Sequence, residues 1–222
     1  MRVLVVVAHP DDEVLGCGAT LARHADEGDT AEVVVLGRGA LSREGATPSD
    51  ADELQRQAHE AARILGASGI RVLNLPDNRF DRMDLLDIVK QVEAEIHRVN
   101  PEVVYTHHAA DLNIDHRRTF EAVVTACRPV EASGVRRILS FEIPSSTEWQ
   151  SPTVPPGFLP NVFVDVTRTL ERKLSAIGIY SGEIRSAPHP RSIEALTALA
   201  CWRGASAGMK AAEAFVLVRQ RI

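Results

Sequence analysis

The sequence has few cysteines, few aromatic residues, no long apolar run and no excess of basic residues. Its 30 acidic residues outnumber its 25 basic ones. A nucleic-acid partner is therefore not expected, because such a partner needs a basic face. No stretch approaches the roughly 20 apolar residues that a membrane-spanning helix requires, so no integral membrane segment is predicted. The short apolar run near the N-terminus lacks the features of a signal peptide and is interpreted as a strand.

The three cysteines, Cys17, Cys127 and Cys201, are odd in number and far apart, and the sequence contains no CxxC motif. Neither a disulfide framework nor a thiolate zinc site is expected from this pattern. Each cysteine is interpreted as a small buried hydrophobic residue. The cytoplasm is the expected compartment.

The 222 residues, 45% of them hydrophobic, are enough to form one core, and a single domain over 1–222 is predicted. Apolar runs alternate with helical patterns, which predicts a Rossmann-like three-layer α/β/α fold with a mostly parallel sheet. Strands are predicted over 2–8, 31–37, 70–75, 102–107, 136–143, 161–166 and 214–220. Helices are predicted over 13–28, 49–67 (with Ser49 or Asp50 as N-cap), 84–100, 115–128, about 167–181, and after 192. Residues 1–140 form the regular half, and the loop-rich residues 141–222 are expected to complete the site.

Polar side chains follow the predicted strands, at the edge where open α/β sheets bind ligands. The first strand runs into "AHPDDE", residues 8–13, which gathers three carboxylates and a histidine in one turn. A dinucleotide site would need a GxGxxG turn that offers backbone N–H groups to a pyrophosphate. Three negative charges in that turn would repel phosphate, so a bound divalent cation explains the segment better.

His9 and Asp12 are three residues apart across this turn, close enough to bind one ion. A third ligand must come from elsewhere, and His116, after the fourth predicted strand, is the best candidate. Two histidines and one aspartate leave a coordination position open, as in catalytic zinc sites. Asp11 is then a spare carboxylate beside a ligand, and it is interpreted as a general base. Glu13 is interpreted as a partner of the helix dipole or as a hydrogen-bonding support of the site.

The segments "AHPDDE" and, about 100 residues later, "DLNIDHRRT" resemble the PIG-L/LmbE-like family of zinc-dependent de-N-acetylases, and "AEAFVLVR" resembles that family's C-terminal end. The resemblance implies that His9, Asp12 and His116 are the metal ligands and that Asp11 is the catalytic base. It implies Zn²⁺ as the metal, with Fe²⁺ or another divalent ion as the alternative. The implied partner is a small acetamido sugar or glycoconjugate of the N-acetylglucosamine type, or a related amide of a sugar conjugate. A homo-oligomer is left open.

One position departs from the family pattern. The thiol-sugar deacetylases carry "HPDH" where this chain has Asn113-Ile114-Asp115-His116. In those relatives the first histidine helps to polarise the carbonyl, whereas Asn113 can donate a hydrogen bond but carries no proton. An imidazole from elsewhere is an alternative for this role, and His189 is ranked ahead of His107 and His108.

The remaining candidates each keep two interpretations. Asp115 either orients a ligand histidine or caps its helix. The adjacent His107 and His108 face opposite ways in a strand, so at most one is expected to enter the site. Arg43, Asp77 and Arg79 are candidates for binding sugar hydroxyls or a phosphate, with a solvated or salt-bridged role as the alternative. His108 is a further candidate for substrate binding, with a structural role as the alternative.

Metal-assisted amide hydrolysis is the function that this set of residues favours. A non-haem Fe(II) oxygenase also binds its metal through two histidines and one carboxylate, but its chemistry gives no role to Asp11. A metal- or sugar-binding module without catalytic activity is a third interpretation. Strict dependence on O₂ would favour the second, and absence of turnover on acetylated sugars would favour the third.

Overall fold

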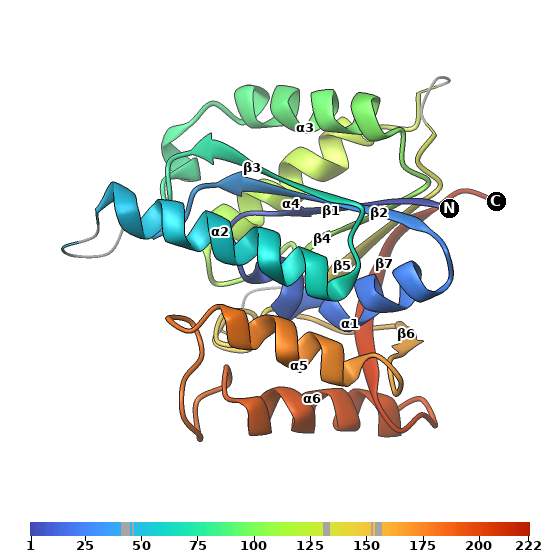
Figure 1. Ribbon diagram of the computed structural model, residues 1–222. Helices are drawn as coiled ribbons and strands as arrows, with labels where there is room; N and C mark the ends of the chain where they lie inside the picture. Colours follow the sequence, from blue (N-terminus) through green and yellow to red (C-terminus); the bar gives the residue numbers. More distant parts are fainter. Residues whose placement is uncertain (41–44, 46, 131–133, 152, 154–156) are drawn as a thin grey trace.

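The computed structural model describes residues 1–40, 45, 47–130, 134–151, 153 and 157–222. Within these residues, seven strands form one sheet in the order β3-β2-β1-β4-β5-β7-β6 (Figure 1). β1 to β5 run parallel, whereas β7 is antiparallel to both of its neighbours. The strands are β1 (Arg2–Val7), β2 (Thr30–Gly37), β3 (Gly69–Leu75), β4 (Val103–His107), β5 (Arg137–Phe141), β6 (Val162–Asp165) and β7 (Ala212–Gln220). The predicted fold class is confirmed.

Helices cover both faces of the sheet (Figure 1). α3 (Leu85–Val99) and α4 (Ile114–Ala126) pack on one face, whereas α1 (Asp12–Asp26), α2 (Pro48–Leu65) and α5 (Leu170–Ile179) pack on the other. α6 (Ile193–Ala205) lies beyond α5, and a short 3₁₀ helix, η1 (Phe80–Arg82), follows β3. Because β1 is covered on both faces, its segment "VLVVV" is completely buried. Among the described residues, no helix is both long and apolar enough to cross a membrane.

The strand order creates a crevice beside β1. The chain passes from β1 to β2 on one side, whereas β4 pairs with β1 on the other side. The connections β1–α1 and β4–α4 therefore diverge to opposite faces at the carboxyl ends of two neighbouring strands. Ligands of doubly wound sheets bind at such a switch point. The turn "AHPDDE" and the start of α4 both lie there.

Helix α1 contains a break that the sequence pattern does not predict. Cys17 has φ −149° and ψ 24°, which interrupts the helical hydrogen bonds. The backbone N–H groups of Ala19 and Thr20 instead donate to the carboxylate of Glu213, at 3.1 and 2.7 Å. Lys173 pairs with the same carboxylate at 2.6 Å. The C-terminal strand β7 thus supplies the acceptor that the broken helix needs.

Two other local expectations are wrong. Thr47, not Ser49 or Asp50, is the N-cap of α2, since Pro48 occupies its first turn and Asp50 completes a capping box with Thr47. Cys17 and Cys127 are buried as expected, whereas Cys201 is exposed. Cys201 belongs to α6, the outermost helix, which packs on the rest of the protein by one side only.

Candidate active site

A cavity of about 160 Å³ opens at the switch point between β1 and β4. Its lining comes from the turn after β1, the segments after β2, β3, β4 and β5, and the connection between α5 and α6. The lining residues are His9, Pro10, Asp11, Asp12, Gly39, Ala40, Leu54, Asp77, Asn78, Asn113, His116, Ser145, Ser146, Glu183 and Arg191.

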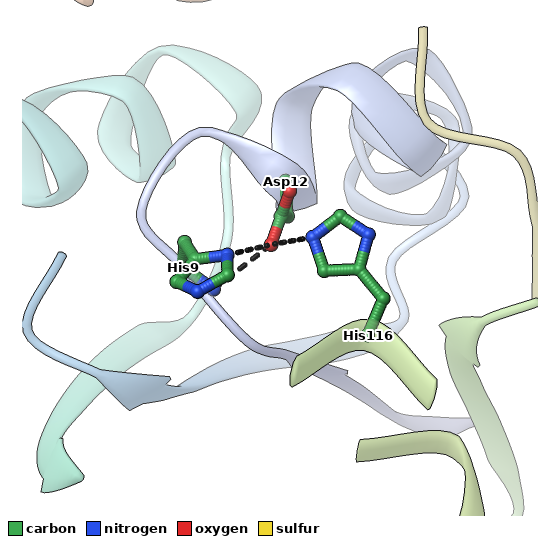
Figure 2. Close-up of side chains that lie close together, drawn as sticks. All are labelled: His9, Asp12 and His116. Atoms are coloured by element: carbon green, nitrogen blue, oxygen red, sulfur yellow. Dashed lines mark hydrogen bonds and ion pairs between the residues drawn. The ribbon is translucent and has the colours of Figure 1, made fainter. Parts of the chain in front are cut away.

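The three predicted metal ligands lie together at this cavity. Figure 2 shows the carboxylate of Asp12 between the imidazoles of His9 and His116. Asp12 Oδ2 is 3.4 Å from His9 Nδ1 and 3.4 Å from His116 Nε2. Two ligand atoms of a tetrahedral zinc ion, with bonds of about 2.0–2.2 Å, lie roughly 3.3–3.6 Å apart. The spacing therefore fits one small divalent cation.

A second carboxylate lies behind each of the two histidines. His9 Nε2 donates to Asp115 Oδ2 at 3.0 Å, and His116 Nδ1 donates to Asp111 Oδ1 at 3.0 Å. In the neutral imidazoles, these bonds leave the lone pair on His9 Nδ1 and on His116 Nε2, the two nitrogens that face Asp12. Metal-binding histidines in proteins carry the same carboxylate support on their second nitrogen. The donor set fits a bound cation in type and in orientation.

Without a cation, the carboxylates hold protons on both imidazoles. Burial acts to lower the pKa of His9, but Asp115 and Asp12 outweigh it and raise the pKa to about 10. Burial likewise opposes the charge on His116, and Asp12 and Asp111 raise its pKa to about 9. Burial acts to raise the pKa of Asp12, yet the charge of His116 holds it well below its ordinary value. A cation at this position would replace those protons.

Asp11 occupies a strained position next to these ligands. Its φ is +104°, a value that non-glycine residues rarely adopt. Its backbone N–H donates to Glu13 Oε2 at 3.1 Å, and Tyr180 donates its hydroxyl to Glu13 Oε1 at 2.5 Å. Glu13 is thus a buried support of the turn, in line with one of its two interpretations. Burial, opposed by the charge of Arg191, raises the pKa of Asp11 to about 7.

The cavity also contains an arginine that sequence reasoning missed. Arg191 Nη1 lies 2.7 Å from Asp11 Oδ2 and 3.4 Å from Glu183 Oε2. Arg191 and Glu183 come from the connection between α5 and α6, and Arg191 follows Asp11 by 180 residues. No local motif marks Arg191, because its contact with Asp11 depends on how two distant segments pack together.

Of the two adjacent histidines at the end of β4, it is His107, the last residue of that strand, that lies against the ligands. Its ring stacks on that of His116, with centroids 4.0 Å apart and planes 12° apart. Its Nε2 accepts the N–H of Ala8 at 2.9 Å, so it keeps no lone pair for a cation. Burial lowers the pKa of His107 to about 3, and the ring is neutral. His108 instead lines a separate cavity, where it contacts Phe158 edge to face.

Asn113 and Asp77 line the cavity, but their polar atoms already have partners. Asn113 Oδ1 accepts the N–H of Asp115 at 2.8 Å and so caps α4, and its Nδ2 donates to Asn78 at 3.1 Å. Asp77 Oδ1 lies 3.5 Å from His9 Nε2. Asp115 itself orients His9 and also accepts the N–H of Phe80 at 2.9 Å; it is Asn113, not Asp115, that caps the helix.

Besides His108, two predicted site residues, His189 and Arg79, do not line this cavity. His189 accepts the backbone N–H of Arg191 at 3.1 Å and contacts Trp149 edge to face. Arg79 is exposed before η1. Arg43 lies outside the described residues. The catalytic and substrate-binding roles of these residues stay predictions.

Asp111 is a further residue without an assigned role in the sequence. Besides His116, it accepts the hydroxyls of Ser146 and of Thr147, the latter at 2.6 Å. It therefore ties the Pro- and Ser-rich loop after β5 to a ligand histidine. Its position just after the fourth strand was visible in the sequence, but its partners come from a loop 35 residues away.

Known proteins share both the sequence and the shape of this chain. The family model described as PIG-L, GlcNAc-PI de-N-acetylase, matches residues 4–127. The uncharacterized deacetylase YaiS of Escherichia coli is 34% identical over 74% of this chain and 81% of its own length. The 4-oxalmesaconate hydratase of Pseudomonas putida is 29% identical over 81% of this chain and 73% of its own length.

A crystal structure agrees with the fold along the whole chain. The conserved protein TT1542 of Thermus thermophilus has a TM-score of 0.81 and 26% identity, and the match covers 100% of this chain and 96% of that one. Further relatives are named as deacetylases of sugars that carry N-acetylglucosamine-type units. The matched segment includes the turn after β1 and the start of α4, which together hold the candidate ligands. The chain belongs to the PIG-L family, whose relatives are mostly named as deacetylases.

Proposed function

We propose that the protein is a metal-dependent hydrolase that removes the acetyl group from an N-acetylglucosamine-type sugar or glycoconjugate, with Asp11 as the general base. One observation carries the proposal. His9, Asp12 and His116, which could bind one metal ion, line the same cavity as Asp11, whose carboxylate is not one of these three potential ligands. Family membership supports the same chemistry.

His9, Asp12 and His116 would hold the cation, and Zn²⁺ suits two imidazoles and one carboxylate. Bound there, a divalent ion polarises the acetamide carbonyl and makes water more acidic. Asp115 and Asp111 keep the two imidazoles in the tautomers that such binding requires.

Asp11 takes a proton from the attacking water. In the cation-free fold, burial raises the pKa of Asp11 to about 7, so its carboxylate is a stronger base than an ordinary aspartate. Oxygen bonds to the acetamide carbon as the carbonyl π electrons move to oxygen. The C–N bond then breaks, the protonated Asp11 returns a proton to the departing amine, and acetate and the free amino sugar leave.

Asn113 is the proposed donor to the oxyanion, since its amide lies at the cavity wall. His189 would reach the substrate only if that substrate extends beyond the cavity, towards Trp149. Asp77 is placed to accept a hydroxyl of the sugar.

The Asp11→Asn variant tests the proposal. We expect it to bind the metal as the wild type does, while acetate release from N-acetylglucosamine derivatives falls about 10²–10⁴-fold, the usual contribution of a general base. Asp87→Asn, an exposed change in the first turn of α3, is the matched control. Wild-type rates in Asp11→Asn would rule out the assigned base.

Hydration is a second candidate function, favoured by the similarity to a 4-oxalmesaconate hydratase. The same residues would activate water for addition to a carbon–carbon double bond. Purified, metal-loaded protein should be offered both substrate classes in parallel. Acetate release without consumption of 4-oxalmesaconate, followed by NMR, supports the deacetylase; the reverse pattern supports the hydratase.

A further inference from the structure

The carboxylate of the proposed base has one partner in the described structure. Asp11 is 4% exposed, and Arg191 Nη1 contacts its Oδ2 at 2.7 Å. Among the residues that the structure describes, no other hydrogen bond reaches this carboxylate. The guanidinium therefore occupies one oxygen of Asp11 and leaves Oδ1 for water.

Arg191 is itself held from three sides. Its Nε donates to Ser145 Oγ at 2.8 Å, and to the carbonyl oxygen of Pro144 at 3.4 Å. Glu183 Oε2 lies 3.4 Å from Nη1 on the other side. These partners come from the loop after β5 and from the connection after α5. A planar guanidinium held in this way has a fixed position and orientation.

The strained backbone of Asp11 does not by itself orient the carboxylate. A φ of +104° sets where the side chain leaves the backbone, and the N–H bond to Glu13 maintains that turn. The backbone conformation leaves more than one staggered rotamer open to the side chain. Since a base must lie within about 2.6–3.2 Å of the proton it takes, something has to select one of these rotamers.

We propose that Arg191 is the positioning residue of the catalytic base: it pins Asp11 Oδ2, so that Oδ1 faces the water that attacks the substrate. Glu183 in turn holds Arg191. The inference rests on the proposed function of Asp11. It assigns to the connection between α5 and α6 a direct part in the chemistry of the turn after β1.

Direct binding of a substrate anion by Arg191 is less consistent with the charges. The guanidinium already contacts two buried carboxyl groups, Asp11 and Glu183, which offset its positive charge inside the cavity. An anionic substrate group would have to displace one of these carboxyl groups. Positioning leaves both of them and the guanidinium in place.

Arg191→Ala and Arg191→Lys are the test variants, with Arg185→Ala as the matched control. Arg185 belongs to the same connection, but it is exposed and bonds only to backbone carbonyls of its neighbours. In Arg191→Ala we expect kcat to fall roughly 100-fold, as for a misplaced catalytic group, with little change in KM. Arg191→Lys should recover only part of the rate, because one ammonium group cannot contact Asp11, Glu183 and Ser145 together.

Chemical rescue separates positioning from folding. The side chain of Arg191 is 19% exposed, so the space it leaves in Arg191→Ala is reachable from solvent. Millimolar guanidinium should restore a measurable part of kcat in that variant and should not affect Arg185→Ala. Metal content should match the wild type, and the variant should still unfold in one cooperative thermal transition, at a lower temperature because two buried carboxyl groups lose a partner. An unchanged kcat, or a raised KM with unchanged kcat, would overturn the proposal; the latter would show substrate binding instead.

A structural measurement keeps this inference distinct from the proposed function. If wild-type protein releases no acetate from any substrate offered, the proposed function fails. Crystal structures of the metal-loaded wild type and of metal-loaded Arg191→Ala then test whether Arg191 positions Asp11, independently of any activity. A rotated Asp11 carboxylate in the variant supports it, whereas an unmoved carboxylate contradicts it.

Discussion

Each candidate ligand histidine lies between two carboxylates, and this arrangement sets both its tautomer and its charge. Asp12 faces the metal side of His9 and His116, whereas Asp115 and Asp111 face the opposite nitrogens. The two imidazoles are therefore already oriented to bind a cation in the cation-free fold. Removing a supporting carboxylate should weaken binding without removing a ligand.

Asp115→Asn tests this carboxylate support. Asp115 accepts two donors, His9 Nε2 and the N–H of Phe80, at 3.0 and 2.9 Å. An asparagine amide has only one oxygen, so its NH₂ group would face one of these donors. We expect metal affinity to fall about 10–100-fold, measured by competition with a chromophoric chelator. Asp87→Asn is again the control; unchanged affinity in Asp115→Asn would show that His9 needs no such support.

The sequence predicts different roles for two adjacent acidic residues, a ligand for Asp12 and a base for Asp11, because Asp12 has the spacing from His9 that one ion needs. Both residues line the candidate cavity, and their roles stay predictions. Arg191 could not be predicted, since its contact with Asp11 bridges 180 positions in the chain.

At the scale of secondary structure, two helix starts bring the site together. α1 begins at Asp12 and α4 begins just after Asn113. Gly16 permits α1 to approach β5 closely, since a Cβ there would lie 2.3 Å from the ring of Phe141. Asn113 has a double position, as N-cap of α4 and as part of the cavity wall.

Substitutions of Asn113 should separate these two positions. Asn113→Ala removes the cap and should cost about 1 kcal/mol of unfolding free energy. Asn113→Asp keeps a favourable capping oxygen but lacks the amide donor proposed for the oxyanion, so we expect near-native stability with reduced kcat. Urea denaturation and acetate release measure the two effects. Full activity in both variants would remove Asn113 from the catalytic set.

At the scale of the whole molecule, distant segments close one cavity. Residues from the first 140 positions supply the candidate ligands and base, and Ser145, Ser146, Glu183 and Arg191 supply the facing wall. A cation bound by His9, Asp12 and His116 would link the turn after β1 to the first turn of α4, and these ligands come together only in the folded state. Because binding to the folded state alone stabilises it, metal removal should lower the melting temperature.

A chelator tests this linkage. At a metal concentration about 100 times the Kd, binding contributes about 2.7 kcal/mol, which for a chain of this size corresponds to roughly 5–10 °C. The shift should disappear in His116→Ala and persist in the exposed control His59→Ala. A metal-dependent shift retained in His116→Ala would exclude this site.

The same shift should depend on pH. In the metal-free fold the pKa values of His9 and His116 are raised to about 10 and about 9, so both imidazoles are protonated at neutral pH and below. Protons then compete with the cation, and apparent affinity should rise with pH and fall as the solution is acidified. Calorimetry in buffers of different ionisation enthalpy should detect proton release on binding.

The sequence alone determined the layered fold and the gathering of one histidine and three carboxylates in the turn after the first strand. Apolar strands alternate with amphipathic helices, and "AHPDDE" combines ligand and base types within six residues, so local pattern is enough. Helix boundaries were predicted to within a few residues, but the break at Cys17 was not, because its cause is the carboxylate of Glu213 on β7.

Only the tertiary structure decided which residues complete the site. It selected His107 rather than His108 to pack on His116, turned His189 towards Trp149, and brought Arg191 to Asp11. The physical reason is that these contacts depend on strand order and on how irregular connections pack. Strand order and the packing of irregular connections have no recognisable local pattern in the sequence. A buried strand followed by a charged turn has one.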